Sequence, residues 1–193
     1  MQNNKNHIFA ARNKKEMTEK RVYIKVHPAA ARYLILTQTR KGDGIKLTDR
    51  TIRDVFESCL GRTNFKGESH VARGYDRKYV RISVIVPDRV FYSLGYEMAR
   101  YWQGVFSAFV YGRLMDEICM TVMANALAGR ANRLWTIEEY LISAGITDEL
   151  KTETVRKHYL RHWRRREQAA REIGEAAGVR RERKGKYKHR YKQ

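Results

Sequence analysis

Both prolines of the chain stand between a short alternating run of β-branched residues and a helical pattern. Pro28 follows "RVYIKVH" and precedes "AAARYLILTQ", and Pro87 follows "KYVRISVIV" and precedes "DRVFYSLGYEMARYW". A proline removes no hydrogen bond in the first turn of a helix, and alternation with a period of two is typical of a half-buried strand. The sequence therefore predicts two strand–proline–helix units, which begin near residues 21 and 79.

The first unit continues into a second helix after the turn "RKGDG" (40–44). The apolar residues that follow recur at helical spacing, which is typical of an amphipathic helix. They are Ile52, Val55, Phe56, Cys59 and Leu60. We expect Thr48 to be the N-cap of this helix and Gly61 to end it. Residues 62–78 are polar and contain glycine, so they are expected to form a linker or loop.

The second unit is expected to contain a helix over 88–102, a break at Gln103–Gly104 and a long helix over 105–127. The long helix carries an apolar residue at every fourth position. These residues are Phe106, Val110, Leu114, Ile118 and Val122. Such a stripe has to pack against a large surface, within the chain or in a partner subunit. Cys59 and Cys119 lie in apolar helical patterns and are expected to be buried, reduced thiols.

A C-terminal pair of helices follows. Thr136 with Glu139 predicts a capping box, Gly145 is expected to end the first helix, and Thr147 or Thr152 to cap the second. The predicted fold class is mainly α with short β-strands: two strand–helix–helix units plus a C-terminal helical pair and a basic tail. The expected segments are a flexible basic N-terminus (1–20), the first unit (21–61), the linker or loop (62–78), the second unit (79–129), a C-terminal helical segment (130–177) and a basic tail (178–193).

Positive charge is concentrated at the C-terminal end of the chain. The formal net charge is +19, from 40 lysines and arginines against 21 acids. Residues 151–193 hold sixteen of these cations and five of the acids, whereas residues 22–150 hold eighteen and fourteen. A field of this sign attracts phosphate backbones at long range. A polyanion is therefore the expected partner.

The stretch "TETVRKHYLRHWRRR" (152–166) separates its aromatic residues from its cations. On a helix, Val155, Tyr159 and Trp163 share an arc of about 80°, and most cations lie on the other side. The aromatic residues are thus expected to dock onto the protein, and the cations to face outward together. These cations are Lys157, Arg161, Arg164 and Arg165. No acid occurs from 154 to 166, so no carboxylate within that span neutralises them, and contact with phosphate is favoured over a merely solvated face.

Several classes of function lack support in the sequence. The longest apolar run carries charges near its centre, so no membrane span is expected. A membrane surface also attracts a positive field, but no membrane is expected among the partners. The first fifteen residues contain no apolar core of a secretory signal, and a cytoplasmic protein is expected. His158 and His162 have a spacing that can hold zinc on a helix, but no third ligand is evident. No nucleotide-binding loop, cofactor, metal site or catalytic residue is predicted, although a DNA-cleaving enzyme stays an alternative.

The segment "YVRISVIVPDRVFYSLGYEMARYWQGVFSAFVYGRLMDEI" (79–118) resembles the ribbon–helix–helix family of DNA-binding proteins. The resemblance rests on the strand, on Pro87, on the turn "QGVFS" (103–107) and on the apolar stripe of the second helix. It implies that two strands pair as an antiparallel ribbon, that Arg81 and Ser83 read bases, and that amides around Ser107 contact phosphate. Both strands come from one chain if residues 21–60 are a second copy, and otherwise a homodimer is needed.

The segment 136–166 similarly resembles a helix–turn–helix, in which a capped helix and "AGIT" precede a basic second helix. This resemblance implies that Lys157, Arg161 and Arg164 lie in or beside a groove of DNA.

The function expected from these patterns is DNA binding in a regulatory or accessory role, as a repressor or a replication, partition or mobilisation factor. The expected nucleic-acid-binding residues are Arg81, Ser83, Arg156, Lys157, Arg161, Arg164, Arg165, Arg166, Arg180, Arg181, Arg183 and Lys184. Alternatives are an RNA-binding component, favoured by the tail "RRERKGKYKHRYKQ", and a structural protein of a virion or assembly whose tail neutralises a packaged genome.

Overall fold

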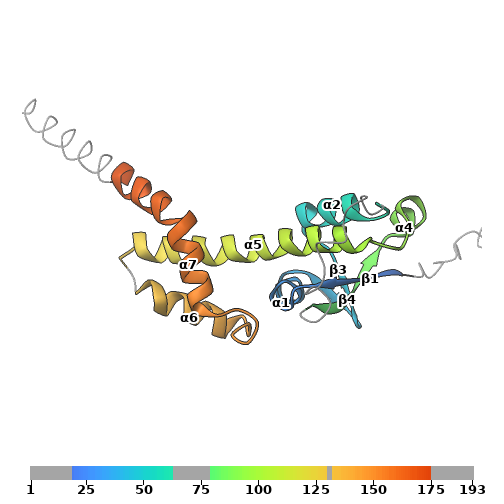
Figure 1. Cartoon of the computed structure of the whole chain (residues 1–193), viewed down its shortest axis with the longest axis horizontal. Helices are drawn as coiled ribbons and strands as arrows, with labels where there is room; N and C mark the ends of the chain where they lie inside the picture. Colours follow the sequence, from blue (N-terminus) through green and yellow to red (C-terminus); the bar gives the residue numbers. More distant parts are fainter. Residues whose placement is uncertain (1–18, 63–78, 130–131, 175–193) are drawn as a thin grey trace, which may run out of the picture.

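The computed structural model of the chain describes residues 19–62, 79–129 and 132–174. In chain order its elements are β1 (Lys20–Val26), α1 (Pro28–Thr37), β2 (Thr39–Lys41), β3 (Gly44–Lys46), α2 (Arg50–Cys59), β4 (Val80–Val86), α4 (Asp88–Leu94), α5 (Arg100–Leu127), α6 (Arg133–Ser143) and α7 (Thr152–His162). Residues 164–174 form a further helix, the arm helix. The expected fold class, mainly α with short strands, is confirmed (Figure 1).

The strands form one small sheet in the order β1-β4-β3-β2. β1 and β4 are antiparallel, with Val22 opposite Val84, and β3 runs parallel to β4 on its other side. β2 and β3 are a hairpin that the sequence did not predict; only its turn, in which Gly42 has a φ of 61°, was expected. Each of these strands has three residues, too few to show an alternating pattern.

The two predicted strand–proline–helix units share this sheet. The strand of the first unit, β1, pairs along its whole length with the strand of the second unit, β4. Pro28 begins α1 as expected, whereas Pro87 is the residue before α4. Pairing of the two strands therefore takes place within one chain.

The chain turns before α5, not at the predicted break. α4 ends at Leu94, Gly95 follows with a φ of 90°, and α5 begins at Arg100, so Gln103 and Gly104 lie inside a helix. The side chain of Gln103 stabilises this arrangement. Its Oε1 accepts a hydrogen bond from the Lys25 amide at 2.8 Å, and its Nε2 donates to the Met98 carbonyl at 2.6 Å. The break predicted at 103–104 is therefore wrong, and so is the turn at 103–107 on which the ribbon–helix–helix resemblance rested.

α5 is the central helix of the structure, and all five residues of its predicted stripe are at most 1% exposed. Its first half packs against β1, α1 and α2, and its second half against α6 and α7 (Figure 1). One apolar core runs from Val22 in β1 to Trp163 after α7. Glu117, in the second half of α5, accepts hydrogen bonds from the hydroxyls of Tyr33 in α1 and Tyr140 in α6, at 2.9 and 2.8 Å.

The N-cap of α2 is Asp49 and not the predicted Thr48. The Asp49 carboxylate accepts a hydrogen bond from the Ile52 amide at 3.0 Å. The amide of Thr48 instead donates to the side-chain oxygen of Gln38 at 2.8 Å. Gly61 follows the end of α2 with a φ of 70°, as expected for a residue that ends a helix.

The predicted caps of the C-terminal pair are also wrong. α6 is capped by Asn132, whose side chain accepts from the Leu134 amide at 3.0 Å, so Thr136 lies within the helix. Lys151 precedes α7, and Thr152 is its first residue. Gly145 does follow α6 with a φ of 61°. α6 thus has a side-chain cap at another residue than the predicted one, whereas no side chain caps the start of α7.

Candidate nucleic-acid interface

The aromatic side of α7 is buried, as its spacing predicted. Val155, Tyr159 and Trp163 are exposed by 0%, 2% and 6%, and all three belong to the core that α5 and α6 form. Lys157 and Arg161 lie on the exposed side. The prediction that the aromatic residues dock while the cations face outward is confirmed for α7.

The basic stretch is not one continuous helix. α7 ends at His162, Trp163 is in a turn, and the arm helix begins at 164. The chain changes direction there, and the arm helix leads away from the bundle (Figure 1). Arg161 and Arg164 are therefore on two helices, and the single stripe of cations predicted from helical spacing is wrong.

A buried carboxylate connects the arm helix to the rest of the molecule. Glu167, exposed by 3%, accepts hydrogen bonds from Arg133 at 3.1 and 2.5 Å, from Arg171 at 2.8 Å and from the Tyr159 hydroxyl. Arg171 also donates to the Ala126 carbonyl at the end of α5, at 3.1 Å. The hydrogen bond from Arg133 is the main cause that lowers the pKa of Glu167 to about 2. The direction of the arm helix is thus set by paired charges.

Glu153, one residue before the acid-free span, changes the charge pattern of α7. Its carboxylate accepts from Arg156 at 2.7 Å and lies 3.8 Å from Lys157. The prediction that Lys157 is unpaired is therefore wrong. Glu and Lys four residues apart on a helix form a known stabilising pair. The spacing of Glu153 and Lys157 was therefore the signal in the sequence for this contact.

Three arginines at the bend have no such partner. Arg161, Arg164 and Arg165 are exposed, and none of them forms an ion pair within the described part of the chain. Arg166 is exposed as well, and its guanidinium lies 4.8 Å from the centre of the Trp163 ring. We call Arg161, Arg164 and Arg165 the arginine cluster. The predicted residues Arg180, Arg181, Arg183 and Lys184 lie outside the described residues, as does most of the predicted linker.

The two residues predicted to read bases lie in the sheet, apart from the arginine cluster. Arg81 is exposed, and its guanidinium stacks on the Tyr23 ring at 4.5 Å from the ring centre. Ser83 is only 6% exposed, and its hydroxyl has no hydrogen-bond partner among the residues that the structure describes. Ser107 is 1% exposed inside α5, and its hydroxyl accepts from the His27 amide, so amides around it are not at a turn.

α6 and α7 pack against each other, as the helix–turn–helix resemblance implies. The connection between them, 144–151, contains a further turn and is longer than a tight turn between two helices. Ile146 and Leu150 from this connection are buried by 97% or more, with exposures of 0% and 3%. The longer connection thus contributes to the core.

The described residues give little evidence for a metal site or a reactive thiol. The rings of His158 and His162 lie 4.7 Å apart, and burial lowers the pKa of His158. No group of three metal-ligating side chains is found among residues 19–62, 79–129 and 132–174. Cys59 and Cys119 are buried, free thiols, as predicted.

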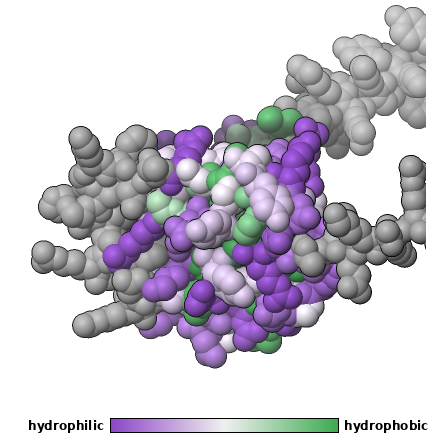
Figure 2. All heavy atoms as spheres, turned by 90° about the vertical axis from the view of Figure 1, so that its right-hand side faces the viewer, coloured by the Kyte–Doolittle hydropathy of each residue, from purple (hydrophilic) through white to green (hydrophobic). Residues whose placement is uncertain are grey.

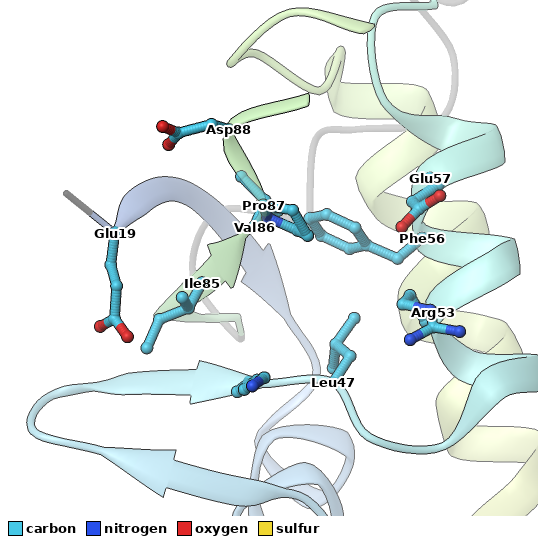
Figure 3. A pocket seen from close by; sticks show the side chains of 10 residues that line it. Glu19, Leu47, Arg53, Phe56, Glu57, Ile85, Val86, Pro87 and Asp88 are labelled. Carbon is cyan, nitrogen blue, oxygen red and sulfur yellow. The ribbon is translucent and has the colours of Figure 1, made fainter. Parts of the chain in front are cut away.

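A small apolar pocket of about 140 Å³ lies between α2 and the end of β4 (Figure 3). Leu47, Phe56 and Pro87 line it, and its rim carries both cations and acids, among them Arg53 and Glu57. Because these charges are mixed, the pocket does not extend a cationic surface. The end of the molecule that carries α4 is mostly hydrophilic, with scattered apolar side chains (Figure 2).

No helix within the described ranges is both long and apolar enough to cross a membrane. Comparison of the chain with protein-family models, with curated proteins and with solved structures finds no match.

Proposed function

We propose that the chain binds duplex DNA as a regulatory or accessory factor, with the arginine cluster as its principal phosphate contact. The observation that carries the proposal is the exposure of Arg161, Arg164 and Arg165 without a carboxylate partner in the described part of the chain. Neighbouring cations repel one another unless an anion relieves them, and a phosphodiester backbone supplies such anions in a row.

The way in which the cluster is held supports this proposal. Trp163 anchors the bend in the core, the buried Glu167 holds the arm helix through Arg133 and Tyr159, and Arg171 donates to the end of α5. The three guanidinium groups thus extend from backbone that is already ordered, which reduces the entropy lost on binding. Arginine also matches phosphate through a fork of donors, so its contacts are stronger than those of a point charge.

The test compares a triple variant, Arg161→Gln, Arg164→Gln and Arg165→Gln, with the unchanged chain in binding to a duplex over a range of salt concentrations. Removal of three phosphate contacts is expected to reduce the slope of log affinity against log salt by about 2–3. Affinity near physiological salt should fall by at least about tenfold.

A matched control removes the same charge from the other end of the molecule, with Arg50→Gln, Arg53→Gln and Arg89→Gln on α2 and α4. It is expected to change the slope by less than half as much. Equal effects of the two triple variants, or no binding of the unchanged chain in dilute salt, would contradict the proposal. Tighter binding of structured RNA than of duplex DNA, lost in the same cluster variant, would move the partner to RNA.

A further inference from the structure

A hollow of about 570 Å³ lies at the open corner of the sheet beside α1, and Ile35, Ile45 and Ile82 are among the residues that line it. It lies where the β2–β3 hairpin stops short of the beginning of β4, because β3 pairs only with residues 83–85. Tyr23, Arg40, Asp43, Arg81 and Ser83 are among the residues that line it. The hollow thus combines residues from all parts of the sheet.

The charge in the hollow is positive. The carboxylate of Asp43 is engaged by Arg21 in an ion pair. Arg40 and Arg81 are exposed, and neither has an ion-pair partner in the part of the chain that the structure describes. Two guanidinium groups therefore face the hollow without a neutralising carboxylate of their own.

The floor of the hollow contains an unsatisfied hydroxyl. Ser83 lies between Tyr23 on β1 and Gly44 on β3, directly opposite both in the sheet. Its Oγ is buried and has no hydrogen-bond partner among the described residues. Buried hydroxyls nearly always have a partner, so one without is a feature that calls for a ligand or a water. Ser83 is itself among the residues that line the hollow.

We propose that this hollow binds a phosphate group, held by the guanidinium groups of Arg40 and Arg81 with the Ser83 hydroxyl as a further donor. Stacking on Tyr23 orients the plane of Arg81, which leaves the donor edge of the guanidinium available. The phosphate belongs either to the backbone of a nucleic acid or to a free nucleotide. This role differs from base reading, since a buried Ser83 does not present itself to a groove.

The test is a titration of the full chain with inorganic phosphate, followed through the side-chain Nε resonances of ¹⁵N-labelled arginines. Arg40 and Arg81 are expected to shift together and saturably. The double variant Arg40→Gln, Arg81→Gln should weaken binding by at least about tenfold, and Ser83→Ala by about two- to fivefold. Ser83→Ala removes an unsatisfied group, so the variant is expected to fold.

The control for this titration is Arg50→Gln with Arg89→Gln, which removes two cations from α2 and α4 and is expected to leave phosphate binding unchanged. An unchanged affinity in the Arg40/Arg81 double variant, or an equal loss in the control, would overturn the proposal. Adenosine monophosphate and a short duplex, each added as a competitor, distinguish the sources of the phosphate, because the true source displaces it at the lower concentration.

This inference stands apart from the proposed function. The Arg161, Arg164 and Arg165 triple variant is expected to bind inorganic phosphate as well as the unchanged chain does. A chain that binds the duplex but shows no saturable shift of Arg40 and Arg81 would remove the phosphate site and leave the function of the arginine cluster intact.

Discussion

Glu167 shows how one residue can determine the direction of a helix. It follows three consecutive arginines, 164–166, and precedes Arg171, so in the sequence it is one more charge in a basic stretch. In the structure it is buried and receives donors from α6, α7 and the arm helix. Its partner Arg133 is 34 residues away, a separation at which no helical spacing predicts a contact. Sequence reasoning located the neighbouring cations but not the carboxylate that orders them.

At this scale we predict that Glu167→Gln lowers the free energy of unfolding by about 2 kcal/mol at neutral pH, because it leaves two arginines without their carboxylate. The measurement is equilibrium denaturation in urea. The comparison is Glu153→Gln, which removes an exposed ion pair of the same type on α7 and should have little effect. Equal losses in the two variants would show that burial of Glu167 contributes nothing.

Glu167 should also make stability depend on acid pH. Its pKa in the folded chain, about 2, lies below the ordinary value of 4.5, so the charged form stabilises the fold. This contribution is complete above pH of about 4.5 and is lost as the pH falls toward 2. We expect the Glu167→Gln variant to lack this part of the acid dependence. Denaturation curves at a series of pH values between these limits measure it, and parallel curves for both chains would contradict the assignment.

At the scale of elements, the strands β1 and β4 and the stripe of α5 were predictable because their patterns are long and regular. The hairpin β2–β3 and the break between α4 and α5 were not. "QG" is a frequent turn sequence, but here the tertiary hydrogen bond from the Lys25 amide to Gln103 favours a helix. The break instead falls at Gly95, where the chain has a positive φ. Contacts between distant segments decided both features.

Gly61 lies where the end of α2 contacts the end of α4 and the segment between α4 and α5. It has a φ of 70°, its amide donates to the Glu97 carbonyl at 3.2 Å, and a Cβ at this position would lie 1.9 Å from the Leu94 carbonyl oxygen. Gly61→Ala is therefore expected to cost about 2–3 kcal/mol of stability. Gly129→Ala is the matched comparison, because Gly129 has a similar φ of 66° but open space around it. Its cost should be about 1 kcal/mol, measured by thermal denaturation, and equal costs would argue against the close contact.

At the scale of the whole molecule, α5 makes the sheet and the C-terminal helices parts of one core. We therefore predict that they unfold together. Native-state hydrogen exchange should give the amides of Val84 in β4 and Tyr159 in α7 the same free energy of opening. Leu114→Ala, in the middle of α5, should lower both values by about 2–4 kcal/mol. A much lower value for Tyr159 alone would show that the C-terminal helices open separately.

The side of α5 that faces α7 is buried by Val155, Tyr159 and Trp163. The C-terminal end of the protein therefore cannot be shortened at any chosen residue. A chain that stops before α7 does not simply lose a binding surface; it leaves apolar side chains of α5 facing water. Such a fragment is expected to aggregate, so its failure to bind any ligand carries no information about contacts. The workable boundary for a shortened protein lies after Arg171, where the last anchoring contact of the arm helix has been made.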